Sequence, residues 1–198
     1  MEVSKVKFLL AITTGVISAS VAGFGAPSPR DAPVSGSISQ DEIAIYDAVL
    51  APWSGQNPER QFVDFNLSAP PSPADPELFP CTKGLRFSSG AQRTEGHKSL
   101  LGVHFKRSAV ELTDGSKWKP DDPGRAIANG QSVDTAVSQG FAHSLISFSQ
   151  AIFTDDGKDA LVKFSMVCGR LCGSFATIHL HKSRTQWKVA NRCSGGML

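Results

Sequence analysis

The segment from Leu145 to Asn191 alternates apolar and polar residues, and this pattern constrains the fold more than any other feature of the chain. A period of two is typical of β-strands that bury one face. Four strands are predicted, over 145–153, 159–168, 176–181 and 186–191. The side chains expected to face the core are Ala160, Val162, Phe164, Met166, Cys168, Ala176, Ile178, Leu180, Trp187 and Val189. Short turns join the strands, so the segment predicts an antiparallel β-meander with one face buried against the core and one face exposed to solvent, the wet face.

An amphipathic helix is predicted near the start of the domain, over residues 41–50. Ser39 is a good N-cap residue, the acidic pair Asp41 and Glu42 suits the positive helix end, and Pro52 ends the helix. Its apolar stripe is formed by Ile43, Tyr46 and Leu50. Because this stripe must cover another surface, the sequence predicts an α+β fold. In that fold the N-terminal helix packs on a mostly antiparallel sheet that ends in the β-meander.

The middle of the chain is less regular. Proline recurs between residues 54 and 80, and only Gln61–Leu67 alternates like a strand there. Further short strands are expected over 84–88 and 100–106, with a short helix over 132–138. Most of this region is therefore expected to be loop.

The N-terminus has the composition of an export signal. Lys5 and Lys7 precede an apolar run over residues 8–22, and Ser20 and Ala22 suit a small-x-small cleavage site. The run is too short and too rich in Ser, Thr and Gly for a membrane-spanning helix. We therefore expect a signal peptide at 1–22, a flexible leader at 23–38 and a single α+β domain at 39–198. The mature protein is expected to be secreted or periplasmic, with no stable membrane insertion.

The chain has four cysteines, Cys81, Cys168, Cys172 and Cys193, and four cysteines in an exported chain indicate two disulfides. Three pairings are conceivable. The structural interpretation joins Cys168 to Cys172 across a three-residue hairpin loop, whose flanking Cα atoms lie about 5–6 Å apart. Cys81 then pairs with Cys193. The alternative interpretation is a redox-active dithiol at the hairpin, although the C-x3-C spacing differs from the C-x-x-C of thioredoxin-like proteins.

The C-terminal segment also resembles a family of uncharacterised exported bacterial proteins. The resemblance rests on FSQAIFTDDGKDALVKFSMVCGRLCGSFATIHLHKSRTQWKV, which contains an ALV strand, CGRLCG and a closing W-K-V strand. It covers residues 145–190 well and residues 39–51 loosely. The family closes with Trp-Ile-Ser, whereas this chain ends NRCSGGML. The resemblance implies a location in the bacterial cell envelope and implies no activity.

Residues with potential for catalysis or metal binding are few. His179 and His181 share one strand face and are weak candidates for metal ligands, because a catalytic zinc site needs a third protein ligand. His97, His104 and His143 are the other histidines. The G-x-S-x-G and H-E-x-x-H motifs are missing, and no S-x-x-K is accompanied by an SDN or KTG motif. We therefore predict no catalytic residues, no metal and no cofactor.

The sequence favours a binding function over an enzymatic one. The net charge is +2, from 20 Lys and Arg against 18 Asp and Glu, which argues against a nucleic-acid partner. The leading hypothesis is a non-enzymatic domain that binds a protein or a small molecule in the cell envelope. The alternatives are a thiol–disulfide redox protein that uses Cys168 and Cys172, or a metal-dependent hydrolase that uses His179 and His181.

Overall fold

A computed structural model describes residues 37–52, 60–88, 97–106, 109–119, 121–170 and 172–197, all within one compact unit, Pro33–Leu198. The predicted signal peptide and the predicted leader up to residue 36 lie outside these residues. No helix in the described part of the chain has both the length and the apolar character to cross a membrane.

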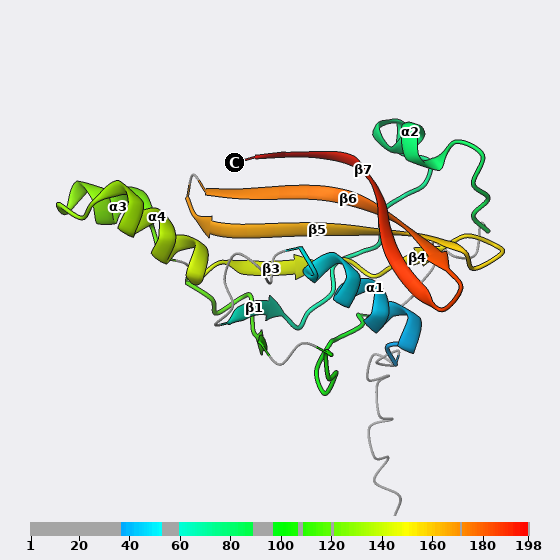
Figure 1. The fold of residues 1–198 in the computed structure, drawn as a ribbon, viewed down its shortest axis with the longest axis horizontal. Coiled ribbons are helices and arrows are strands. Elements are labelled where there is room, and N and C mark those ends of the chain that lie inside the picture. The colour runs from blue at the N-terminus through cyan, green and yellow to red at the C-terminus, as the bar shows by residue number, and fades with distance from the viewer. Residues whose placement is uncertain are drawn as a thin grey trace, which may run out of the picture. The chain divides into compact units, whose positions relative to one another are not determined.

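The described residues form a helix-and-sheet fold (Figure 1). Its elements are α1 (Gln40–Leu50), β1 (Gln61–Asp64), η2 (Pro76–Leu78), α2 (Phe79–Thr82), β2 (Val110–Thr113), α3 (Pro123–Ala128), α4 (Val133–Ala142), β3 (Leu145–Phe148), β4 (Ile152–Phe153), β5 (Asp159–Gly169), β6 (Cys172–Ser183) and β7 (Gln186–Met197). The strands make one sheet in the order β2-β1-β3-β5-β6-β7, and β4 pairs with β5. The predicted α+β fold class and the C-terminal β-meander, β5-β6-β7, are confirmed.

The sheet is mixed. β3, β5, β6 and β7 are antiparallel neighbours, whereas β1 is parallel to both β2 and β3. Parallel neighbours require long crossover connections. The prolines between residues 70 and 80 and the helices α3 and α4 lie within these crossovers, which explains why so much chain separates short strands.

The helix α1 begins as predicted. Glu42 N donates to Ser39 Oγ at 3.2 Å and Ser39 N donates to Glu42 Oε2 at 2.9 Å, which makes a reciprocal capping box. The buried apolar residues of α1 are Ile45, Tyr46, Val49 and Leu50. Tyr46 and Leu50 are buried as predicted, but Ile43 is only half-buried. The buried face of the helix is therefore rotated from Ile43 toward Ile45 and Val49.

The main core lies between α1 and one face of the sheet. The Phe148 ring sits 4.9 Å from the Tyr46 ring and 5.9 Å from the Phe164 ring, measured between centroids. Nine of the ten meander side chains expected to face inward are buried. The exception is Val189 of β7, which is 41% exposed, whereas Trp187 of the same strand is buried.

The opposite face of the sheet is partly covered, so the prediction of one wet face is only partly right. Leu161 is fully buried there with Leu78 and Ile152, and the half-buried side chains of Phe87 and Cys193 pack against this group. The covering segment, η2 and α2, is held to β7 by the Cys81–Cys193 disulfide. A long-range covalent link therefore supplies the cover that local periodicity does not indicate.

Several boundaries differ from the predictions. The segments 84–88 and 100–106 are not strands, and α3 and β2 were not expected. The segment around residue 100 is instead held by single contacts, such as Leu100 N donating to Phe65 O at 2.8 Å. The helix α4 is longer than predicted, the 145–153 strand is divided into β3 and β4, and β7 continues to Met197.

Replacing Asp41 with asparagine is expected to reduce the acid sensitivity of the fold. Hydrogen bonds from Lys182 Nζ at 2.8 Å and Trp187 Nε1 at 3.1 Å lower the pKa of the Asp41 carboxyl below its ordinary value of 3.8. A lowered pKa means that the stabilisation is complete above the unfolded-state value and is lost as pH falls through the folded-state value. Urea unfolding at pH 7 and pH 3 should therefore show a smaller loss of stability in Asp41→Asn than in the wild type. Equal losses would contradict this account.

Candidate functional site

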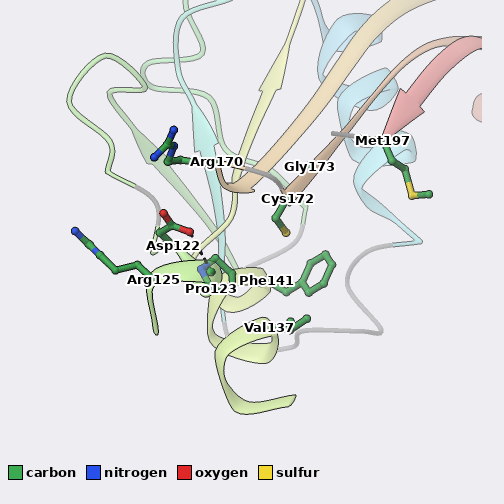
Figure 2. A pocket seen from close by; sticks show the side chains of 10 residues that line it. Asp122, Pro123, Arg125, Val137, Phe141, Arg170, Cys172, Gly173 and Met197 are labelled. Carbon is green, nitrogen blue, oxygen red and sulfur yellow. Dashed lines mark hydrogen bonds between the residues drawn. The ribbon is translucent and has the colours of Figure 1, made fainter. Parts of the chain in front are cut away.

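A cavity of about 810 Å³ is lined by residues of α3, α4, the β5–β6 hairpin and the end of β7 (Figure 2). We call it the α4 cavity. Figure 1 shows α3 and α4 beside the end of the sheet where β5 and β6 are joined. The walls of the α4 cavity come from four places in the sequence: the start of α3, the exposed side of α4, the β5–β6 hairpin and the end of β7. The local sequence explains both helices. Asp122 Oδ1 accepts from Gly124 N at 3.1 Å with Pro123 at the first helical position, and Ser132 Oγ accepts from Thr135 N at 3.3 Å.

Close packing positions the helices against the hairpin. The buried Pro123 ring lies against both Gly140 of α4 and Gly169 of β5. A Cβ at Gly140 would lie 2.6 Å from Pro123 Cγ, and one at Gly169 would lie 2.8 Å from Pro123 Cδ. Gly169 also has a φ of 152°, which side chains rarely allow. These two glycines therefore let the helix pair approach the hairpin that forms the cavity wall.

The four cysteines form two disulfides in the structure. Cys81 joins Cys193 with Cα atoms 5.4 Å apart, and Cys168 joins Cys172 with Cα atoms 5.1 Å apart. Cys168 is fully buried, whereas Cys172 is half-buried and lines the α4 cavity. The hairpin bond thus fixes the backbone of one cavity wall, and only its Cys172 end borders the cavity.

The α4 cavity has a charged side and an apolar side. Figure 2 shows Asp122, Arg125 and Arg170 toward one side of the view. It shows Val137, Phe141 and Met197 toward the other, with Pro123 and Cys172 between the two groups. Met197 is 89% exposed and Phe141 is also exposed. Exposed apolar side chains gathered at one hollow are a common feature of binding sites.

The charged side carries an excess of positive charge. Arg125 and Arg170 are exposed and form no ion pair with another described residue, and a guanidinium stays protonated in proteins. One carboxylate oxygen of Asp122 accepts the hydrogen bond that caps the N-terminus of α3. The arrangement can therefore bind an anion through the arginines while apolar atoms contact Phe141 and its neighbours.

His179 and His181 lie close together, and both imidazoles are within hydrogen-bond distance of one carboxylate. His179 Nε2 lies 2.7 Å and His181 Nδ1 lies 3.0 Å from the same oxygen, Asp159 Oδ1. Asp159 faces His181 across the β5–β6 hairpin. His143 lies elsewhere, with Nδ1 2.7 Å from Asp121 Oδ2. Within the described ranges, no three His, Cys, Asp or Glu side chains are arranged to hold a metal ion.

Sequence reasoning located one wall of the α4 cavity, the CGRLC hairpin, but not the rest. Arg125, Phe141 and Met197 lie in three separate elements, and no local pattern links them. The sequence of α4 gives a partial indication of the apolar side of the cavity, because Val133, Val137 and Phe141 recur every four residues and so share one face of the helix.

The comparisons with known proteins identify no relative of this chain. No protein-family model matches it, and neither the curated proteins nor the solved structures contain a match.

Proposed function

We propose that this chain is an exported binding domain of the bacterial cell envelope, and that the α4 cavity binds a small amphipathic carboxylate of the fatty-acid type. The observation that carries the proposal is the division of this one cavity into a side with two arginines and a side with Phe141, Val137 and Met197. Export is supported by the N-terminal signal pattern, and two disulfides are compatible with an oxidising compartment.

The chemistry of the two sides matches the two parts of such a ligand. A planar guanidinium donates two parallel hydrogen bonds to a carboxylate, which supports Arg125 and Arg170 as partners of the head group. An alkyl chain on the apolar side would remove the exposed Phe141 and Met197 surfaces from water, at about 25 cal/mol for each Å² buried.

The size of the cavity also suits a small ligand. Its volume of about 810 Å³ falls in the range of roughly 300–1,000 Å³ that is usual for small-molecule sites. The disulfide at Cys172 and the packing of Pro123 preorganise the walls, which reduces the entropy lost on binding.

Calorimetric titration with dodecanoate, below its micelle concentration, tests the proposal. We expect saturable binding, and we expect the double variant Arg125→Gln/Arg170→Gln to bind at least tenfold more weakly, because each charge-assisted hydrogen bond contributes about 1.5–3 kcal/mol. The matched control is Arg60→Gln/Arg192→Gln, which removes the same charge from exposed residues outside the cavity. The control should bind like the wild type, and the uncharged analogue dodecanol should bind more weakly than dodecanoate.

Two results would overturn the assignment. If dodecanoate does not bind, or if both double variants bind it equally, the arginines of the α4 cavity are not a carboxylate site. If an apolar hexapeptide with a free carboxyl terminus binds more tightly than dodecanoate, the occupant is a peptide and the fatty-acid proposal fails.

The competing redox hypothesis makes a different prediction. Cys172 borders the α4 cavity, so a thiol substrate bound there would meet this sulfur and not the buried Cys168. A catalytic Cys168–Cys172 bond must then be reduced at the potentials of thiol oxidants, about −120 to −270 mV, in a glutathione titration. We expect the bond to resist reduction over that range, as structural disulfides do.

A further inference from the structure

A second, smaller cavity of about 330 Å³ lies over β3, β5, β6 and β7, and its lining is rich in hydroxyl groups. We call it the hydroxyl cavity. The hydroxyl side chains that line it are Ser68, Ser147, Ser149, Ser165, Thr177 and Ser194. The charged lining residues are Lys163, Asp75 and Glu77, and the exposed aromatic residue is Phe175.

The strand register arranges these side chains as a grid. Ser147 is paired with Ser165, which is paired with Phe175. In a parallel row, Lys163 is paired with Thr177, which is paired with Ser194. Paired residues on neighbouring strands are about 5 Å apart, so polar side chains recur at that spacing across the floor of the cavity.

Phe175 forms an aromatic platform beside the grid. Its ring lies against the backbone of Gly196 on β7, where a Cβ would come within 3.1 Å of the ring Cζ. Gly196 therefore leaves room for the ring to rest on the sheet, and the Phe175 side chain remains 47% exposed. The exposed face of this ring is therefore open to a ligand that stacks on it.

Several polar groups of the grid are available to a ligand. Ser147, Ser165, Thr177 and Lys163 form no side-chain hydrogen bond or ion pair with another described residue. Thr177 is buried even so. Ser149, in contrast, is used internally, since its Oγ accepts from Lys163 N at 2.8 Å.

From this combination we infer that the hydroxyl cavity binds a neutral saccharide of one or two rings. A sugar ring has a face of C–H groups that stacks on an aromatic ring, and a rim of hydroxyls that each donate and accept hydrogen bonds. Phe175 supplies the ring, and Ser147, Ser165 and Thr177 supply the hydroxyl partners. The charges of Lys163, Asp75 and Glu77 do not favour an anion, because the acidic groups outnumber the cation. The volume lies at the small end of the usual range, which limits the ligand to about one or two rings.

Titration of the ¹⁵N-labelled protein with maltose, cellobiose and N,N′-diacetylchitobiose tests the inference. We expect at least one of them to shift the amide signals of Ser165 and Thr177, and we expect Phe175→Ala to weaken that sugar at least tenfold. The matched control is Phe79→Ala, which removes an exposed phenylalanine that does not line the cavity and should leave sugar binding unchanged. Ser165→Ala is a milder second variant that should weaken the same sugar severalfold.

The dodecanoate affinity of each variant separates this inference from the proposed function. It should stay at the wild-type value, because neither Phe175 nor Ser165 lines the α4 cavity, and it also reports that the variants are folded. The inference is overturned if none of the three sugars shifts these signals, or if Phe175→Ala and Phe79→Ala bind the sugar equally. It is also overturned if inorganic phosphate displaces the sugar, since the cavity is then an anion site.

Discussion

Replacing Cys81 and Cys193 together with serine should lower the free energy of unfolding by about 4–5 kcal/mol. The two cysteines are 112 residues apart, and in the chain-entropy model a cross-link over about 100 residues stabilises by about 4.7 kcal/mol. The bond also holds η2 and α2 over Leu161 on the second face of the sheet. Urea unfolding of the oxidised proteins measures the loss.

The hairpin disulfide provides the matched control. Cys168 and Cys172 are only four positions apart, so replacing both with serine should cost about 2 kcal/mol in the same model. A loss at the hairpin as large as that at Cys81 and Cys193 would show that the long-range bond does not organise the fold.

Replacing Phe148 with alanine should destabilise the fold by about 3–5 kcal/mol, the usual cost of deleting a large buried aromatic side chain. The Phe148 side chain is 1% exposed and stands between Tyr46 of α1 and Phe164 of β5. Its removal leaves a cavity where the helix meets the sheet. The Tyr46 hydroxyl, which donates to Ser149 O at 3.1 Å, restricts how far α1 can move to fill it.

Phe79→Ala is the control for this substitution, because Phe79 is 63% exposed. Its removal should change the free energy of unfolding by less than about 0.5 kcal/mol. If the two variants lose similar stability in urea, the helix α1 is not packed on Phe148 in the way described. If Phe148→Ala lowers the free energy of unfolding by about 3–5 kcal/mol without changing the m-value, the loss comes from packing in the folded state.

The meander was predictable because its stabilising pattern is local. Alternation in β5 and β6 identifies the buried set, and the disulfide hairpin fixes the register. In this hairpin, residues at equal sequence separation before and after Arg170 are paired. Asp159 and His181 are each eleven positions from Arg170, so the sequence predicts that they lie opposite each other. The carboxylate partner that the two histidines share is therefore readable in the sequence.

The remaining structure depends on contacts between distant segments. The parallel pairing of β1 with β2 and β3 joins short strands across long crossovers, and no turn between them specifies the register. Burial of Leu161 depends on the segment that Cys81 tethers. Val189 alternates correctly but is exposed, whereas Trp187 of the same strand is buried, so alternation alone does not predict burial on β7.

The same reason explains why the candidate sites were only partly predictable. The α4 cavity exists because Gly140 and Gly169 let Pro123 approach the hairpin, which is a property of three positions together. The hydroxyl cavity depends on the register between β3, β5 and β6. Serine is common on the solvent-exposed face of a strand, so the sequence alone does not indicate a cavity there. Asp75 and Glu77, at the start of η2, complete the lining of the cavity.

Methyl NMR of protein labelled at the methionine methyl groups tests the central claim most directly. Met197 lines the α4 cavity and is 89% exposed, whereas Met166 is buried in the main core and serves as an internal control. On titration with dodecanoate we predict that the Met197 signal moves to saturation while the Met166 signal stays in place. If Met197 does not move, or if both signals move together, the α4 cavity is not the binding site.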